Sequence, residues 1–235
     1  MRRIAAIVIA TAVSAGACGG DETGPTLAPN VDVVLAAATD AMTAVDTVYF
    51  TLERGGAPVY IDSLDTIAFE SAEGRYAAPG RAEAVVQVSL VGLNTQIGAV
   101  AIDGVTWITN PITGDYEPAP AGYEFDPATL FDPAVGLPLL LDGELGGATL
   151  IGLEDRDGEM RYHVRGTAPA ERVEVITARL VRGQDVELDL WLDPVGGEVA
   201  EAAFSTEFNA GVTTWRLTFF DYGAEVEITE PNLNG

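Results

Sequence analysis

Alternation of apolar and polar residues dominates the chain from residue 48 onward, and this period of two is typical of β-strands with one buried face. It is clearest at 82–90, where every second residue is apolar. Asp103-Gly104 and Asp157-Gly158 are turn signals between neighbouring runs, which favours antiparallel meanders. The pattern predicts strands at 48–53, 60–69, 82–90, 96–102, 105–108, 148–154, 161–166, 186–192, 199–208, 212–220 and 225–228.

A helical period replaces the alternation at two longer segments. Apolar residues recur at spacings of three and four over 31–45, with Asn30 placed as N-cap and Asp32 in the first turn. The segment 169–180 is compatible with helix or strand, and Pro169 at its start favours a helix. We therefore expect two helices, each with one apolar stripe that packs against a sheet.

Two shorter helices are predicted between the groups of strands. Asp126-Pro127 and Asp132-Pro133 each place a proline directly after a capping residue, which predicts helices over 128–131 and 134–141. Many strands with few helices indicate an α+β fold: one curved antiparallel sheet of about ten strands, a half-barrel, with helices over its concave face. Such a sheet can enclose an apolar cavity. A fully packed core explains the same pattern, so both interpretations stay open.

The N-terminus carries a secretory signal. A basic start, Met1-Arg2-Arg3, precedes an apolar run that is too short to span a membrane and leads into Ser14-Ala15-Gly16-Ala17-Cys18. Small residues before a cysteine resemble a bacterial lipobox, although Ala15 stands where leucine is usual. We predict a signal peptide over 1–17, a lipidated Cys18 and a flexible tether over 18–30, with one domain at 31–235. A plain signal peptide with an incidental cysteine is the alternative.

Charge and composition narrow the possible partners. The formal net charge is −24, and the chain contains no lysine. Removal of Arg2 and Arg3 with the signal makes the mature protein more acidic still. Such a surface repels nucleic acid, so we expect no nucleic-acid partner. Because Cys18 is the only cysteine, no internal disulfide can form, and the apolar residues, 48% of the chain, must supply the stability.

Residues for catalysis or metal binding are scarce. His163 is the only histidine and lies within a predicted strand, which favours a structural role over catalysis. The chain has no G-x-S-x-G motif, and one histidine with one distant cysteine cannot form a usual zinc site. Asp155 to Glu159 is more typical of a charged turn than of a calcium loop. We predict no enzyme activity, no cofactor and no metal; a hydrolase is a distant alternative.

Several stretches, in order along the chain, resemble one known family. The clearest, YEFDPATLFDPAVGL at 123–137, is similar to the signature Y-D-P-S-x-I-L-D-P-x-x-G-L. The similarity extends from about Val31 to Pro231, and the family is that of the LppX/LprG-like lipoproteins of mycobacteria and related actinobacteria. The other matching stretches are VDTVYFTL at 45–52, IDGVTW at 102–107, YHVRGTAPA at 162–170, WLDP at 191–194 and FDYG at 220–223.

The resemblance implies a LolA/LolB-like fold with an apolar cavity for acyl chains, and no catalysis. We therefore expect a lipoprotein anchored on the extracytoplasmic face of the cell membrane. It would bind an acylated envelope lipid or glycolipid and carry or present it, as a monomer that works with a membrane lipid exporter. A membrane-anchored scaffold with a filled core is the alternative. The expected cavity residues are Val86, Val88, Leu90, Ile102, Trp107, Leu130, Leu137, Leu140, Leu141 and Leu190.

Overall fold

A computed structural model describes residues 29–233, except 63, 91, 111–112 and 120–125. The helical elements are α1 (Val31–Thr43), the 3-10 helix η1 (Pro127–Phe131), α2 (Leu137–Leu139), the π-helix η2 (Leu140–Glu144) and α3 (Ala170–Ile176). The strands are β1 (Thr47–Gly56), β2 (Val59–Tyr60), β3 (Ile67–Ala77), β4 (Arg81–Leu90), β5 (Leu93–Ile102), β6 (Val105–Thr109), β7 (Tyr116–Pro118), β8 (Gly146–Arg156), β9 (Glu159–Ala168), β10 (Val186–Leu192), β11 (Val199–Phe208) and β12 (Gly211–Phe220).

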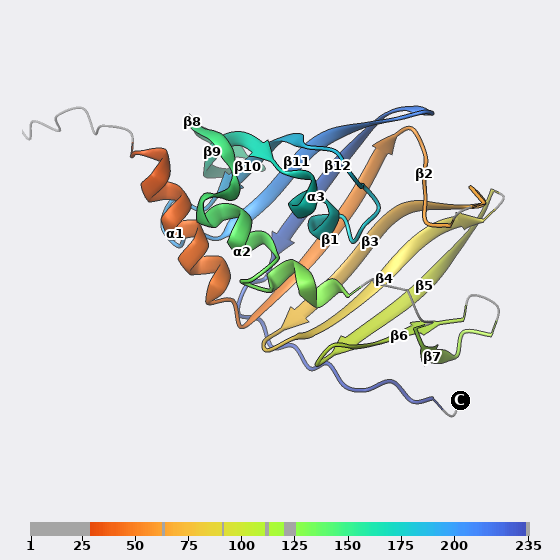
Figure 1. Ribbon diagram of the computed structural model, residues 1–235. Coiled ribbons are helices and arrows are strands. Elements are labelled where there is room, and N and C mark those ends of the chain that lie inside the picture. Colours follow the sequence, from red (N-terminus) through yellow and green to blue (C-terminus); the bar gives the residue numbers. More distant parts are fainter. Residues whose placement is uncertain (1–28, 63, 91, 111–112, 120–125, 234–235) are drawn as a thin grey trace, which may run out of the picture.

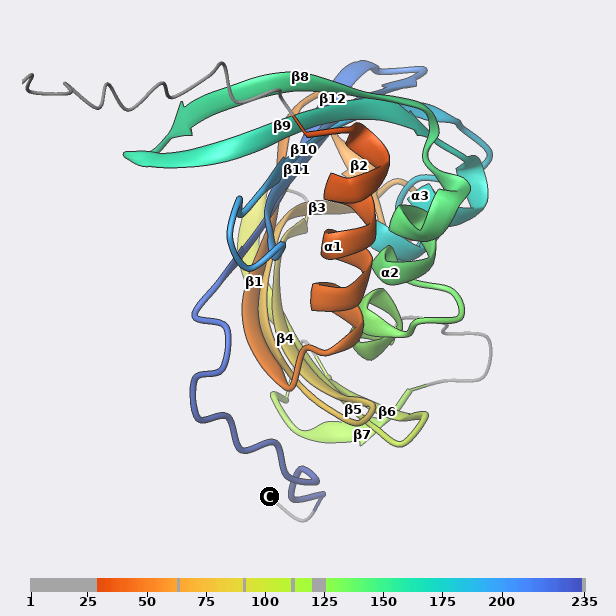
Figure 2. The same cartoon turned by 90° about the vertical axis from the view of Figure 1, so that its left-hand side faces the viewer.

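All strands join one 12-stranded antiparallel sheet (Figure 1). Its order is β7-β6-β5-β4-β3-β1-β12-β11-β10-β9-β8, with β2 paired to β3 outside this path. The central strand β1 pairs with the last strand, so that Tyr49 lies opposite Phe220, and one meander continues on each side. Figure 2 shows the sheet bent into a half-barrel with the helices inside the bend. The predicted fold class is confirmed.

Helix α1 crosses the concave face as its apolar stripe predicts. Asn30 accepts a hydrogen bond from the backbone N–H of Asp32 and caps the helix. Val34, Leu35, Ala38 and Met42 are its buried residues. The helix ends at Thr43, two residues before the predicted end. No helix among the described residues is both long enough and apolar enough to cross a membrane.

The helix predicted over 128–131 is present as the 3-10 helix η1, with Asp126 as its N-cap, whereas the other two helical segments differ from the prediction. The expected helix over 134–141 begins only at Leu137 and consists of the three residues of α2 followed by the π-helix η2, in which Asp142 and Gly143 have non-helical dihedral angles. Gly136 lets this segment approach η1, because a Cβ atom there would meet the carbonyl oxygen of Leu130 at 2.4 Å. Helix α3 ends at Ile176, since Ala178 and Arg179 adopt left-handed φ values of 49° and 66°.

The strand predicted over 60–69 is wrong. Strand β2 ends at Tyr60, where Asp62 folds the chain into a turn by accepting hydrogen bonds from the backbone N–H groups of Leu64, Thr66 and Ile67. The long strand β3 follows the turn. A shift of register between Phe69 and Ser71 interrupts its alternation, which hid most of β3 from the sequence pattern.

The strand predicted at 225–228 is also wrong. This segment runs along the lower edge of the sheet in Figure 1 and covers part of the convex face instead of joining the sheet. Ile228 is 3% exposed, and its carbonyl oxygen accepts a hydrogen bond from Arg81. It packs against a small second core of Ala77, Val100, Ile102 and Trp107.

Candidate functional site

The concave face carries a continuous row of apolar side chains from β5 to β8. Directly opposed residues of antiparallel strands point to the same face, so the register defines the row. Val86 and Leu190, both predicted cavity residues, belong to it and are 9% and 0% exposed. In strand order the row is Ile97, Val86, Ala72, Leu52, Leu217, Ala202, Leu190, Val164 and Leu150.

Most predicted cavity residues lie in the main core beneath the helices. The members of that core are Val86, Val88, Leu130, Leu137, Leu140, Leu141 and Leu190. Ile102 and Trp107 do not share this face: Ile102 lies opposite Arg81, Trp107 lies opposite Val100, and both belong to the second core. Leu90 ends β4 and is 39% exposed. Cys18 lies outside the described residues.

An aromatic cluster that the sequence analysis missed closes the space between η1 and the sheet. Phe131 of η1 lies 4.3 Å from Tyr76 and 5.9 Å from both Phe50 and Phe219, measured between ring centroids. The Phe50 ring covers Gly74, where a Cβ atom would lie 2.5 Å from its Cζ atom. The alternation of β1 and β12 could have indicated Phe50 and Phe219, whereas no period marks Phe131.

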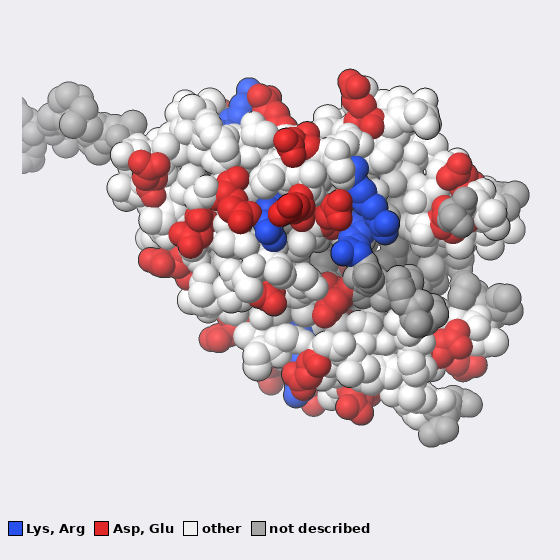
Figure 3. Space-filling model, in the orientation of Figure 1, with Lys and Arg blue, Asp and Glu red and all other residues white. Residues whose placement is uncertain are grey.

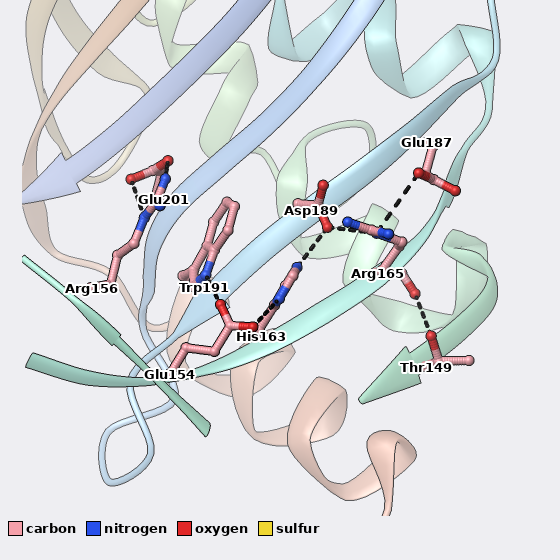
Figure 4. A network of polar contacts seen from close by, with 9 residues as sticks. All are labelled: Thr149, Glu154, Arg156, His163, Arg165, Glu187, Asp189, Trp191 and Glu201. Carbon is pink, nitrogen blue, oxygen red and sulfur yellow. Dashed lines mark hydrogen bonds and ion pairs between the residues drawn. The ribbon is translucent and has the colours of Figure 1, made fainter. Parts of the chain in front are cut away.

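The opposite, convex face of β8–β10 carries a network of charged and aromatic side chains (Figure 4). His163 lies between two carboxylates: its Nδ1 atom is 2.9 Å from Glu154 Oε1, and its Nε2 atom is 2.6 Å from Asp189 Oδ1. Its ring stacks on Trp191 at a centroid distance of 4.8 Å. Glu154 also accepts a hydrogen bond from the Trp191 indole, and Asp189 accepts one from Arg165.

Arginine side chains extend this network to β11 and β12. The Arg156 guanidinium lies 4.1 Å from the centroid of the Trp191 ring and pairs with Glu201. Glu201 is 4% exposed and also lies 3.4 Å from Arg216. A carboxylate this buried is stable only when cations compensate it. The network therefore holds five neighbouring strands in register.

The electrostatics of the network favour ionised carboxylates. Hydrogen bonds from His163 and Trp191 lower the pKa of Glu154 below its ordinary value. For Asp189, burial alone would raise the pKa, but the hydrogen bonds from Arg165 and His163 outweigh it and the pKa is lowered. Both carboxylates stay charged well into the acid range.

The contacts of His163 give it a structural role. Both ring nitrogens contact carboxylates, and the ring face is covered by Trp191. No hydroxyl or thiol nucleophile joins these contacts in the described part of the chain. The part of the chain that the structure describes contains no group of three or more acidic, histidine or cysteine side chains that could hold a metal ion. These contacts join strands β8, β9 and β10.

The convex face also contains open grooves, and charged side chains form part of their lining. One groove of about 730 Å³ is lined in part by Glu53, Glu187, Asp189 and Arg216. Figure 3 shows the other, helix-covered side of the molecule, where acidic side chains are also scattered over the surface, in agreement with their high number in the sequence. Charged walls do not suit an apolar ligand. The concave face is therefore the candidate site.

Comparisons with known proteins agree with this architecture. The lipoarabinomannan carrier protein LprG of Mycobacterium tuberculosis is 24% identical over 232 residues, which cover 98% of this chain and 94% of the relative. The crystal structure of LprF from Mycobacterium bovis superposes with a TM-score of 0.65 at 20% identity, over 87% of this chain and 97% of that one.

A second solved structure shows the same fold. The lipoprotein LppX of Mycobacterium tuberculosis superposes with a TM-score of 0.57 at 14% identity and covers 85% of this chain and 98% of its own. Residues 30–228 match the family described as LppX_LprAFG lipoprotein. This range includes both the apolar row on the concave face and the network on the convex face. The chain belongs to the LppX_LprAFG lipoprotein family.

Proposed function

We propose that this protein binds the acyl chains of an envelope lipid or glycolipid against its concave face and carries or presents that lipid outside the cytoplasm. The observation that carries the proposal is the apolar row from Ile97 to Leu150, which crosses the sheet without a polar side chain. The name of the relative LprG, a lipoarabinomannan carrier, supports the same class of ligand.

The energetics of lipid transfer explain why such a surface is useful. An acyl chain of about 16 carbons costs on the order of 12 kcal/mol to expose to water, at about 0.8 kcal/mol per CH₂ group. An apolar protein surface removes most of this cost, so exchange between bilayer and protein becomes nearly balanced. A carrier therefore needs a long apolar surface more than it needs specific polar contacts.

Access to the concave face would require the helical cover to move. Leu137 and Leu140 on the cover, and Leu190 on the sheet beneath, expose no surface. Beside the 13-residue helix α1, the cover consists of short pieces: η1 has 5 residues, α2 has 3, and η2 contains residues with non-helical dihedral angles. Short segments of this kind separate more readily than one long helix, because each has few hydrogen bonds of its own.

The anchor belongs to the same proposal. Lipidation of Cys18 would hold a monomer at the outer face of the cell membrane, since two or more acyl chains anchor a protein stably where one does not. The tether 18–30 would let the domain approach the bilayer that supplies its ligand. It would also let the domain approach a membrane exporter that handles the same lipid. Mass measurement of the mature N-terminus tests this step; an unmodified Cys18 contradicts it.

A membrane-anchored scaffold with a filled core is the second candidate. Burial of Leu137, Leu140 and Leu190 at 0% exposure favours it, because these side chains already have protein neighbours on all sides. A scaffold would need no lipid for stability. The two candidates therefore differ in whether lipid co-purifies with the folded domain.

Native mass spectrometry of the purified non-acylated domain separates them. We expect a bound lipid that extraction identifies, and reduced loading in Val88→Trp, whose new ring fills space beside Phe69. Val105→Trp is the matched control, because Val105 is 50% exposed at the opposite end of the sheet. Circular dichroism verifies folding, and Val86→Phe replaces Val88→Trp if that variant unfolds. A protein that neither co-purifies with lipid nor binds added glycolipid is not a carrier.

A further inference from the structure

Large exposed apolar side chains gather at one end of β2, β4 and β5. Leu64 is 79% and Leu93 is 74% exposed, whereas Leu90, Tyr60 and Ile61 are 39%, 38% and 37% exposed. They come from the β2–β3 loop and the β4–β5 hairpin, which lie side by side at the right of Figure 1. We call these five residues the apolar rim. A concentrated apolar surface with polar surroundings is typical of a contact site.

The register joins the rim to the concave face. Leu90 lies opposite Leu93 and opposite Ile67, whose carbonyl accepts a hydrogen bond from the Ile61 N–H. One step inward along the same strands, Val88 lies opposite Phe69, and these two are only 1% and 2% exposed. The rim is therefore the exposed end of the apolar layer that forms the main core.

Asp62 forms several hydrogen bonds to the residues around Leu64. The Asp62 carboxylate accepts hydrogen bonds from the N–H groups of Leu64, Thr66 and Ile67 and from the Thr66 hydroxyl, at 2.7–3.2 Å. These contacts lower the pKa of Asp62 to about 2. Backbone hydrogen bonds to Asp62 thus accompany an exposed leucine side chain, and an exposed leucine next to other apolar residues suits contact with an apolar partner.

We propose that the apolar rim is the surface by which the protein contacts the bilayer while acyl chains enter or leave the concave face. The inference rests on the proposed function, since it needs a lipid that moves between membrane and protein. Leu64 and Leu93, the most exposed members, would enter the acyl region, and Tyr60 would lie at the headgroup level, where aromatic residues with a polar end are favoured.

Two observations favour a bilayer over a protein partner. The rim continues directly into the apolar layer proposed to hold the ligand, so an acyl chain would pass from one apolar medium to the next without crossing water. With Cys18 lipidated as proposed, a tether from Cys18 to Asn30 would span up to about 40 Å when extended and would keep the domain beside the bilayer at high local concentration.

Fluorescent labels test the contact. The variants Leu64→Cys and Leu93→Cys are made separately in the full acylated protein, and the new cysteine is labelled with an environment-sensitive fluorophore. Wild-type protein treated in the same way shows any background labelling of Cys18. We expect a blue shift at both positions on phosphatidylcholine vesicles. Val105→Cys is the matched control, because it is an exposed valine beyond the opposite end of β5 and should not respond. Equal responses at all three positions, or none at the rim, would overturn the proposal.

Transfer kinetics test the role of the contact. Replacing Leu64 and Leu93 together by Gln should slow uptake of a pyrene-labelled phospholipid from phosphatidylcholine vesicles about tenfold or more, while equilibrium loading from detergent stays unchanged. Val105→Gln with Val195→Gln is the control pair, because Val195 is 97% exposed between β10 and β11, and this variant should transfer at the wild-type rate. Transfer by the rim variant at the wild-type rate overturns the proposal. The proposal also fails if light scattering shows that the wild-type and control proteins are dimers and that the rim variant is a monomer, because the rim would then be a dimer interface. If wild-type protein takes up no lipid by either route, the proposed function fails, while the labels still test the contact.

Discussion

Two rows of side chains cross the sheet one residue apart and face opposite ways. The concave row consists of Ile97, Val86, Ala72, Leu52, Leu217, Ala202, Leu190, Val164 and Leu150. The convex row beside it consists of Gly98, Val85, Glu73, Thr51, Thr218, Glu201, Trp191, His163 and Gly152. The backbone and the register are the same, so the side chains alone give the two faces their different properties.

The difference separates two kinds of cohesion. Apolar contacts on the concave face have no preferred direction, so other apolar atoms can replace them at little cost. Contacts in the convex network are directional, and each carboxylate there needs its own donor. A sheet of this design can keep its register through one face while the other exchanges partners. Three predictions test this interpretation.

Truncation of a concave aromatic should have the largest effect. Phe131→Ala removes a 3% exposed ring from the centre of the aromatic cluster and should lower the free energy of unfolding by about 3–5 kcal/mol. Phe220→Ala is the convex control: its ring is 40% exposed, stacks on Tyr49 at 5.9 Å, and its loss should cost about 1 kcal/mol. Urea denaturation measures both. Equal losses would mean that the concave face is not the main core.

The concave layer was largely predictable because alternation marks it. Val86 and Leu190 were found in this way, and the register confirms that they share a row. Strand β5 shows where alternation fails: Ala99 to Ile102 are all apolar and all buried, since the C-terminal segment covers their convex side as well. A strand with two covered faces has no polar side to define its orientation, so Ile102 was assigned to the wrong face, and Trp107 of β6, which lies opposite Val100, was assigned with it.

Removal of a buried charge on the convex face should have an intermediate effect. Glu201→Gln leaves Arg156 and Arg216 without their shared carboxylate and should cost about 2 kcal/mol. Glu187→Gln is the matched control, because its side chain is 71% exposed and lies 3.7 Å from Arg165, so the change should stay within about 0.5 kcal/mol of zero. Thermal unfolding at neutral pH compares the two variants. Similar shifts of the unfolding temperature in both would contradict a stabilising role for the network.

The convex network could not be predicted from the sequence. Arg156 and Glu201 are 45 residues apart, and only the order of β8 to β11 brings them together. Among so many acidic residues, sequence alone gives no reason to select these partners. His163 was noticed only because it is the single histidine, and its two carboxylates come from β8 and β10.

Acid should weaken the convex network slightly and leave the concave layer unchanged. A carboxyl whose pKa is lowered by folding stabilises the protein above its unfolded pKa, about 4 for Asp and Glu, and loses that contribution as the pH falls through the lower folded value. Unfolding free energy should therefore fall below about pH 4, and Asp189→Asn should reduce that fall by less than about 1 kcal/mol. Asp62 titrates in both the wild-type protein and the Asp189→Asn variant, so the difference between their pH profiles reports on Asp189. Identical pH profiles for the two proteins would show that the bonds from Arg165 and His163 do not stabilise the folded state, and the convex row would then hold the register by Glu201 and its arginines alone.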